Sequence, residues 1–244
     1  RVRNADGSWA DWPEKGRLQE WYGCMECNPY QQGWFVPHDV PGMVEIMGGR
    51  DKVLADLESF FENTPREFYW NPYYNHANEP VHHVPFLFNR LGAPWLTQYW
   101  TRVICADAYK NSLAGLCGNE DVGQMSAWYM FNCAGFYPVA PSSNIYNIGS
   151  PCVEALSIRM SNGKEIKMTT ENWSEENVYI KELYVNGKKY DKSYLTYEDV
   201  QAGITLHFVM SGKPNYKRAV SADARPASLS SPGKTMFYQI SDSK

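Results

Sequence analysis

The chain has 244 residues, of which 43 % are apolar and 20 % charged, a globular composition long enough for one large domain or two small ones. A net charge of −4 with scattered lysines and arginines argues against nucleic acid as a partner. No apolar run reaches the roughly 18 residues of a bilayer-spanning helix. No signal peptide opens the chain, and its polar, Trp-containing first segment is interpreted as a truncated or processed start.

Aromatic residues make up 15 % of the chain, and eight of the nine tryptophans lie before residue 130. Sugar rings stack on indole faces, so this excess suits a carbohydrate-binding cleft, although large aromatic side chains equally fill a core. The six cysteines include the pair Cys24-x-x-Cys27, a spacing found in zinc and redox sites, but no second CxxC pair and no His pair at zinc-finger spacing accompanies it. An even number of cysteines permits disulfides without establishing an oxidising compartment.

Residues 1–23 show no clear period and predict an irregular, aromatic segment. Glu26 follows, the only acid between Glu20 and Asp39, among apolar, amide and aromatic neighbours. Such neighbours would raise the pKa of Glu26 by desolvation and keep it protonated near neutral pH, as a general acid requires. A glutamate in a surface loop is the alternative interpretation.

Helical signals begin at Asp39, which is placed to cap a short helix over residues 44–47 that Gly48-Gly49 would end. Apolar residues then recur at helical spacing over residues 52–63, which predicts an amphipathic helix. Helices in succession, joined by long polar connections, are typical of a helical barrel whose site is built by loops at one rim. Further helices are expected over residues 84–91, 94–108 and 123–134.

A long loop over residues 64–83 is rich in Asn, Pro and Tyr. Loops of this length in a compact chain are usually functional or disordered, and so many aromatic residues fit disorder poorly. Asn78 and Glu79 offer oxygen ligands that suit a hard cation such as calcium. Zinc could bind His82 or His83, but adjacent histidines point apart, so we expect a hydrogen-bonding role for one of them.

Residues 118–128 place two carboxylates and two amides beside glycines, immediately before an apolar run. Burying carboxylates costs free energy, so this cluster needs a reason. One reason is helix capping, with Asp121 as the N-cap and Gln124 as its capping-box partner. The other is a helix start that points a carboxylate into a cleft as a general base, a metal ligand or both. An N-cap needs only one acid, and both interpretations stay open on these residues.

The hydrophobic period changes to two from about residue 153, after a polar stretch that begins at Pro141. A short helix is expected over residues 197–202, and the polar tail after Pro214 would extend over a neighbour or fray. Hairpin turns are expected at Asn162-Gly163 and Asn186-Gly187, among strands over residues 153–160, 165–170, 178–185 and 204–210.

The fold class is therefore mixed α and β, with two regions. Residues 1–150 form a helical region. Its long polar loops make it the region in which we expect a functional site. Residues 151–244 form an antiparallel β-rich module.

Three groups of motifs stand out in the helical region. They cover about residues 1–152 in a fixed order, and several short sequence motifs rarely occur together in one order by chance. The motifs are MECNPYQQGWFVPHDV at 25–40; NEPVHHVPF at 78–86 with GAPWLTQ at 92–98; and GNEDVGQMSAWY at 118–129 with GFYPV at 135–139. In these motifs the chain resembles the C-terminal half of glycoside hydrolase family 92, the calcium-dependent exo-acting α-mannosidases.

The resemblance implies an (α/α)6 helical barrel preceded by a β-sandwich domain. Residues 1–150 would be the C-terminal portion of the barrel, which carries the catalytic site, and residues 151–244 the β module that follows. The family's N-terminal sandwich and first half barrel have no counterpart in the chain, and we expect the chain to pack against them.

The resemblance also implies inversion, in which an acid protonates the leaving oxygen and a carboxylate activates water on the opposite face of the sugar. Glu26 matches the family's acid, and Asp121 matches its base. Asn119 stands where the family often has a second acid, with Glu120 between it and the base, and would orient the water.

Calcium is the implied cofactor, held by Glu79, Asp121 and Asn78, where it would bind the mannose 2- and 3-hydroxyls and ease ring distortion. The expected substrate contacts are Asn78, Glu79, His82 and Gln124. The implied substrate is terminal α-linked mannose on glycans, including N-glycans. By analogy with the family, the enzyme would be secreted or periplasmic.

Two other functions stay open. The missing N-terminal half and the aromatic excess favour a non-catalytic carbohydrate-binding or structural fragment of such an enzyme. A zinc hydrolase using His82, His83 and Asp121 is the other, but this ligand spacing matches no standard zinc site.

Overall fold

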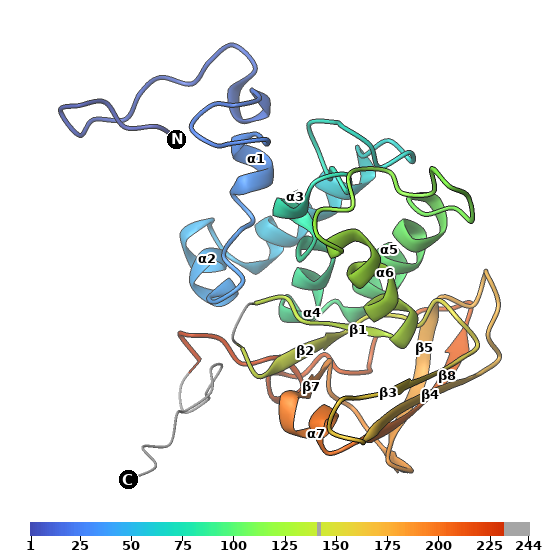
Figure 1. Cartoon of the computed structure of the whole chain (residues 1–244). Coiled ribbons are helices and arrows are strands. Elements are labelled where there is room, and N and C mark those ends of the chain that lie inside the picture. The colour runs from blue at the N-terminus through green and yellow to red at the C-terminus, as the bar shows by residue number, and fades with distance from the viewer. Residues whose placement is uncertain (141–142, 232–244) are drawn as a thin grey trace, which may run out of the picture.

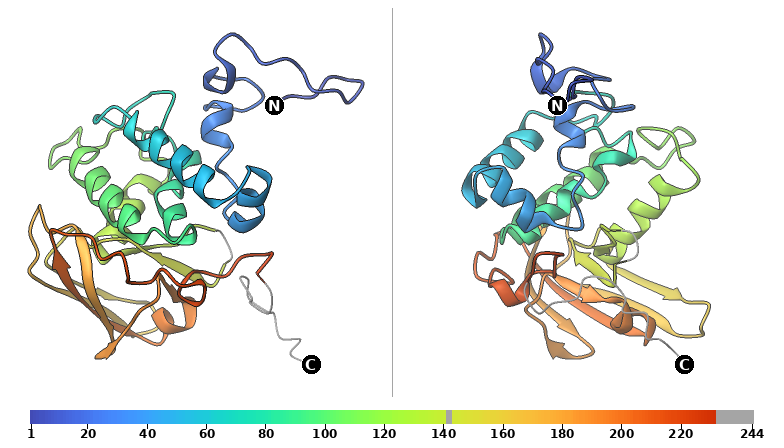
Figure 2. Two further views of the ribbon diagram at one scale, coloured as in Figure 1. Left: turned by 180° about the vertical axis from the view of Figure 1, so that it is seen from behind. Right: turned by 90° about the vertical axis from the view of Figure 1, so that its left-hand side faces the viewer.

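The computed structural model of the chain describes residues 1–140 and 143–231. Helices form one layer, strands lie beneath them, and an extended N-terminal segment projects from the helical layer (Figure 1). The same two layers are visible from behind and from the side (Figure 2). The predicted mixed α and β class is confirmed, whereas the closed (α/α)6 barrel stays a prediction.

The helices predicted from the hydrophobic period are all present in the described residues. The segment predicted as a helix over residues 84–91 begins as a 3-10 helix, Val84–Phe86, and continues as α4. The α-helices of this layer are α1 (Pro29–Gln32), α2 (Val40–Ile46), α3 (Arg50–Glu62), α4 (Leu87–Arg90), α5 (Pro94–Asp107) and α6 (Gln124–Ala134).

Local sequence explains where α2 begins and ends. The Asp39 carboxylate accepts a hydrogen bond from the main-chain N–H of Gly42 (3.3 Å), so Asp39 is the N-cap, as predicted. Gly48 and Gly49 both have a φ of +99°, which glycine adopts without strain, and they separate α2 from α3. Four of the five residues of the predicted apolar face of α3 are buried, namely Val53, Leu57, Phe60 and Phe61, and the fifth, Leu54, is half-buried.

The long loop over residues 64–83 is ordered and forms part of the helical core. Its side chains Phe68, Tyr74 and His76 are fully buried. The ring of Phe61 on α3 packs against that of Tyr74, with centroids 4.8 Å apart. Burial of large apolar side chains offsets the conformational entropy lost in ordering a connection of this length. The expectation that aromatic content keeps the loop from disorder is confirmed.

The strand layer contains two sheets, and a short helix, α7 (Tyr197–Gln201), lies just before the last strand. The strands are β1 (Phe136–Tyr137), β2 (Ile145–Ile148), β3 (Ala155–Arg159), β4 (Glu165–Glu171), β5 (Tyr179–Val185), β6 (Lys188–Lys189), β7 (Tyr194–Thr196) and β8 (Ile204–Ser211). One sheet has the order β1-β2-β7, and the other has the order β3-β4-β8-β5-β6. The strands predicted from the alternating pattern are β3, β4, β5 and β8, whereas β1, β2 and β7 were not predicted.

Both predicted hairpin turns form. Strands β3 and β4 are antiparallel, with Leu156 opposite Met168, and Gly163 between them has a φ of +79°. Strands β5 and β6 are antiparallel, and Asn186 and Gly187 between them have φ values of +49° and +76°. Positive φ at both central residues is the requirement of a type I′ turn, which explains the Asn-Gly sequence.

One pairing contradicts the predicted antiparallel β module. Strand β8 is antiparallel to β5 but parallel to β4, with Met168 opposite Leu206 and Thr170 opposite Phe208. The prediction was wrong here because hairpin turns report only on strands that follow one another closely, whereas β8 enters between two strands far from it in the chain. The larger sheet is therefore mixed.

Contacts cross residue 150 in both directions. Strand β2 pairs with β7 across it. The Asn89 amide donates to the carbonyl of Ile148 (2.8 Å), and the side-chain oxygen of Gln98 on α5 accepts from the N–H of Ile180 on β5 (2.9 Å). The division into domains at this residue stays a prediction.

The C-terminal segment of the described chain returns to the helical layer. The N–H of Leu229 donates to the carbonyl of His38 (3.0 Å), and the hydroxyl of Ser228 donates to the Asp39 carboxylate (3.0 Å). Part of the polar tail thus covers a neighbouring element, as expected. The rest of it, residues 232–244, lies outside the described residues, as do residues 141–142 in the polar stretch where the pattern changes.

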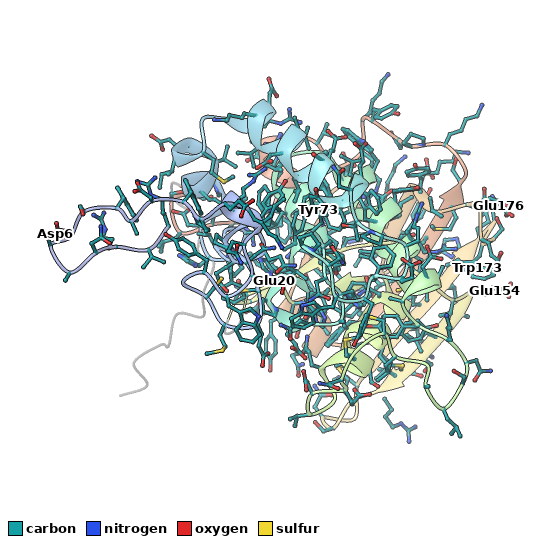
Figure 3. All side chains as sticks on the ribbon, turned by 90° about the horizontal axis from the view of Figure 1, so that it is seen from above. Asp6, Glu20, Tyr73, Glu154, Trp173 and Glu176 are labelled. Carbon is teal, nitrogen blue, oxygen red and sulfur yellow. The ribbon has the colours of Figure 1, made fainter. Side chains whose placement is uncertain are left out.

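Residues 1–23 form an irregular arm, as predicted. Asp6 lies at its tip, on the opposite side of the molecule from Trp173 and Glu176 (Figure 3). Trp9 and Trp21 on this segment are 49 % and 53 % exposed, so they do not fill a core within the described chain. A sugar-stacking role for such tryptophans stays a prediction.

None of the described helices combines the length and the apolar character required to cross a bilayer. All six cysteines are free thiols. The Cys24 thiol donates to the carbonyl of Cys27 (3.3 Å), a contact within the turn that carries Glu26.

Candidate active site

Three carboxyls from distant parts of the chain share one electrostatic environment. Glu26 lies in the turn before α1, Glu79 begins the 3-10 helix Glu79–Val81, and Asp121 lies in the loop before α6. The pKa of Glu79 is raised to about 7, first by burial, then by a hydrogen bond with the Asp121 side chain, and further by the charges of Asp121 and Glu26. The fold therefore brings together the predicted acid, the predicted base and a predicted calcium ligand.

One oxygen of the Glu79 carboxyl, Oε1, is buried, and no described protein group donates a hydrogen bond to it. A buried acceptor without a donor is costly in free energy. Two neighbouring carboxyls lower this cost by sharing a proton or by binding a cation. Glu79 and Asp121 thus meet the electrostatic requirement of a cation site.

The buried side chain of Asn78 links two of these segments. Its Nδ2 donates to the main-chain carbonyl of Glu26 (2.7 Å). Its amide oxygen is the atom available to a cation or a sugar. The Asn78 amide therefore positions the turn that carries the predicted acid.

Amide side chains also hold the turn of Glu26 from the other side. Asn28 caps α1 in a capping box with Gln31, and its Nδ2 donates to the carbonyl of Pro72 (2.8 Å). The Gln31 Nε2 donates to the carbonyls of Asn71 (2.8 Å) and Tyr73 (2.7 Å), the latter labelled in Figure 3. These bonds fasten the motif at residues 25–40 to the long loop.

Glu26 itself is exposed and has a φ of +55°. The prediction that apolar and aromatic neighbours in sequence bury this carboxyl is wrong for the described chain. Those neighbours, Tyr30 and Trp34 among them, are buried in the helical core, whereas the carboxyl is exposed. Sequence proximity to aromatic residues did not translate into contact with them.

The two acids before α6 have different roles, and the predicted N-cap is wrong. The N-cap of α6 is Gly123, and no side chain at that position caps the helix. The carboxylate that caps belongs to Glu120, which accepts from the N–H (3.0 Å) and the hydroxyl (2.8 Å) of Ser126. Asp121 is exposed and is free of the capping task, which favours the other interpretation of this stretch. Asn119 lies beside these acids and is also exposed.

The loop of Asp121 approaches the loop of Glu79 very closely. A Cβ on Gly118 would stand 2.7 Å from the Cα of Ala77 and closer still to its carbonyl oxygen. Only glycine fits there, because real Cβ atoms do not approach backbone so closely. This contact places the predicted base beside the predicted calcium ligands.

Gln124 and His82 form a hydrogen-bond network behind the carboxyls. The Gln124 Nε2 donates to the Tyr137 hydroxyl (2.9 Å) and to His82 Nδ1 (3.2 Å). His82 Nε2 in turn donates to the carbonyl of His76 (3.0 Å), and burial lowers the pKa of His82 to about 4, so the ring is neutral. Both ring nitrogens of His82 therefore have protein partners. Direct substrate contact by His82 and Gln124 stays a prediction.

Sequence reasoning missed two groups of this network. The His76 ring bonds the hydroxyls of Tyr74 and Tyr109 (both 2.8 Å), and Tyr109 donates to the carbonyl of Met125 (3.0 Å), so His76 connects the long loop to α6. Tyr137 was present in the third motif group, but no period or spacing indicated that its hydroxyl meets Gln124.

The alternative zinc site of His82, His83 and Asp121 is not formed in the described residues. Within residues 1–140 and 143–231, no three His, Cys, Asp or Glu side chains are grouped to hold a metal. The rings of the two adjacent histidines are turned to main-chain carbonyls, with His83 Nε2 donating to Trp34 (2.9 Å), as expected for a hydrogen-bonding role. Calcium is a different case, because it accepts amide and main-chain oxygens besides carboxylates.

The proposed acid and base lie at the surface: Glu26 and Asp121 are exposed, and Glu79 is half-buried. Cavities of about 260, 470, 510, 530 and 600 Å³ are among those that indent the described surface, and the three carboxyls line none of these five. Small-molecule sites normally enclose most of the ligand surface.

Comparison with known proteins agrees with the three motif groups. Residues 1–212 match the family model described as the glycosyl hydrolase family 92 catalytic domain. A protein of Arthroderma benhamiae named as an uncharacterized secreted glycosidase is 30 % identical over 207 residues, which are 84 % of this chain and 26 % of that protein.

Solved structures of the same family are also similar. The family GH92 α-mannosidase BT3965 of Bacteroides thetaiotaomicron is 53 % identical, with a TM-score of 0.88, over 98 % of this chain and 32 % of its own. The family GH92 inverting mannosidase BT2199 of that organism is 32 % identical, with a TM-score of 0.81, over 92 % of this chain and 32 % of its own. The chain thus spans about a third of these relatives, and with most of its length matched it belongs to glycosyl hydrolase family 92.

Proposed function

We propose that the protein containing this chain removes terminal α-linked mannose from glycans with inversion of the anomeric carbon. The observation that carries the proposal is the convergence of Glu26, Glu79 and Asp121, three carboxyls from separate segments, in one electrostatic environment. An inverting glycosidase needs an acid and a base about 6.5–9.5 Å apart, with room for a water molecule between the base and the sugar. The similarity to family 92 mannosidases supports the choice of substrate.

In this proposal Glu26 is the general acid and gives its proton to the glycosidic oxygen as the C–O bond breaks. Asp121 is the general base and removes a proton from the water that attacks the opposite face. The product is β-mannose. Asn119, exposed beside the base, orients this water.

Calcium fits the donors that the described residues offer. Glu79 has a buried oxygen without a hydrogen-bond donor, the Asp121 carboxyl lies beside it, and Asn78 keeps its amide oxygen after its Nδ2 donates to Glu26. Hard oxygen ligands of this kind suit Ca2+. When bound, the ion would supply Lewis-acid and template chemistry by holding two mannose hydroxyls.

The remaining walls of the site would come from an N-terminal β-sandwich and half barrel, against which the chain packs. The exposure of Glu26 supports this, since a general acid at neutral pH needs surroundings that keep it protonated, and the described residues do not bury it. Assembly with the missing walls would desolvate it. The secreted fungal relative supports a secreted or periplasmic location, where N-glycans and other mannose-containing glycans are available.

A second candidate is a non-catalytic carbohydrate-binding or structural fragment of such an enzyme. It is favoured by one observation, the exposure of Glu26 and Asp121, since the described residues do not enclose the proposed acid and base. This candidate predicts binding of mannosides by the isolated chain without turnover.

The test measures mannose released from α-mannobiose isomers, with and without a calcium chelator, and follows the anomer by NMR. The protein at its full natural length should release β-mannose, and chelation should stop the release. Glu26→Gln should abolish hydrolysis of unactivated mannosides, since no proton reaches the leaving oxygen, and full activity in that variant refutes the assignment. Release by the isolated chain would exclude the non-catalytic candidate.

A further inference from the structure

We infer that Glu120 is a positioning residue that holds the loop of Asp121 in its working conformation. The inference rests on the proposed function, in which Asp121 is the general base. Glu120 itself is assigned no contact with the substrate.

The Glu120 carboxylate spans the loop from one end to the other. Oε1 accepts from the main-chain N–H of Ser126 (3.0 Å) and Oε2 accepts from its hydroxyl (2.8 Å). Ser126 is the third residue of α6, so the bond ties the residue before the base to the first turn of the helix after it. Hydrogen bonds to a charged acceptor are stronger than those between neutral groups.

The loop closed in this way is strained. Asp121 and Val122 have φ values of +47° and +58°, and Gly123 follows with +89°. The left-handed region is uncommon for any residue with a side chain and a clear outlier for a β-branched one such as Val122. Such a conformation persists only where the surroundings impose it.

Packing does not impose it, because the Val122 side chain is fully exposed. The restraints therefore lie at the two ends of the loop and at the Asp121 carboxyl, which is hydrogen-bonded to Glu79. At one end Gly118 lies against the backbone of Ala77. At the other, the Glu120 carboxylate is joined to Ser126 and the N–H of Gln124 donates to the carbonyl of Asp121 (3.2 Å).

Loss of the Glu120 carboxylate would let the loop relax toward ordinary φ values and carry Asp121 away from Glu79. A base displaced by about 1 Å loses roughly 10²-fold in rate. At saturating calcium, substrate binding would change less than turnover, because Glu79 and Asn78 also offer ligands to the ion, whereas Asp121 alone acts on the attacking water.

The test compares Glu120→Ala with Glu120→Gln in the protein at its full natural length, at saturating calcium. The glutamine variant is the conservative rescue, since its oxygen still accepts from Ser126. Thr196→Ala is the matched control, because Thr196 caps α7 through the N–H of Asp199 (3.2 Å), outside the site. The alanine variant should lose about 10²-fold in kcat with a smaller change in KM, whereas the glutamine and control variants should keep most activity.

Sodium azide provides a readout that a purely structural role would not move. Azide needs no general base: it attacks the anomeric carbon opposite the leaving oxygen, the C–O bond breaks, and that oxygen takes the proton of Glu26. Azide should restore turnover in both Glu120→Ala and Asp121→Asn, with β-mannosyl azide as the product.

The inference fails if kcat of the alanine variant stays within about twofold of the unmodified protein. It also fails if azide restores Asp121→Asn but leaves Glu120→Ala inactive, since the loss then reflects general damage. A different result, full activity in Asp121→Asn, would overturn the proposed base, and the inference about Glu120 with it.

Discussion

The side-chain amide of Asn78 donates a 2.7 Å hydrogen bond to the main-chain carbonyl of Glu26, 52 residues earlier in the chain. It is a direct link between the segment of the proposed acid and the segment of the proposed cation site. The two segments therefore cannot move independently while this bond persists. Its loss should affect catalysis more than folding.

We expect Asn78→Asp to lower kcat/KM by about 10²-fold, because a carboxylate oxygen would face the Glu26 carbonyl and push the turn away. Steady-state kinetics with α-mannobiose checks this, and calcium titration separates it from any change in cation affinity. The matched control is Asn215→Asp, which removes a similar bond to the carbonyl of Lys181 (3.0 Å) away from the site. Equal losses in the two variants would contradict the role of Asn78.

The contact of Gly118 with the backbone of Ala77 predicts a second effect. In Gly118→Ala the added methyl group must separate the two loops, so both calcium affinity and kcat should fall, the latter by about 10²-fold. Calorimetric titration with calcium and initial-rate measurements test it. Gly212→Ala is the control, because its nearest neighbour is the side-chain oxygen of Asn177 at 3.2 Å, which can yield. Unchanged calcium affinity in Gly118→Ala would rule out this explanation of the glycine.

Acid should destabilise the fold through its buried histidines. Burial lowers the pKa of His83 to about 4, whereas the unfolded chain takes up this proton near pH 6.5. The stability that the neutral ring supports is complete above pH 6.5 and is lost as the pH falls towards 4.

His83→Gln should make unfolding less sensitive to pH in this window, by up to about 3 kcal/mol, because the glutamine amide can still donate to the Trp34 carbonyl but does not titrate. Urea unfolding at a series of pH values from 7 down to 4 measures the difference. Parallel pH dependences in the variant and the unmodified protein would show that His83 is not responsible.

Calcium should raise the melting temperature of the protein, since a ligand that binds only the folded state stabilises it. Glu79→Gln should remove most of this rise, because it replaces the carboxylate that has a buried oxygen without a donor. Thermal unfolding with and without calcium tests the prediction. Glu67→Gln, an exposed acid on the same long loop, serves as the control. A rise of equal size in Glu79→Gln would place the cation elsewhere.

Local signals in the sequence predicted most elements of the fold. Helix ends and tight turns depend on the backbone conformation of a few consecutive residues. The predictions of this kind are confirmed, namely the Asp39 N-cap, the helix end at Gly48-Gly49 and the two Asn-Gly turns. The pairing of β8 with β4 and the sheet of β1, β2 and β7 were not, because they join segments that no turn connects.

The residues of the candidate site were also predictable only in part. The motifs identified Glu26, Glu79 and Asp121, and the fold brings them together. The division of roles between Glu120 and Asp121 could not be read from the sequence, because either acid could cap α6 and the choice depends on two left-handed residues. His76 was missed because its partners, tyrosines before and after it, are specified only by the packing of the long loop on α6.

The match to the family model ends at residue 212, but residues beyond it still make contacts that belong to the fold. Ser228 and Leu229 donate hydrogen bonds to Asp39 and His38 at the start of α2, some 190 positions earlier. The C-terminal segment of the described chain therefore holds the start of this helix in place. A variant that ends at residue 212 would lack these hydrogen bonds. Asp39, the N-cap of α2, would then lose a hydrogen-bond donor, and the start of α2 would loosen even though every motif residue was kept.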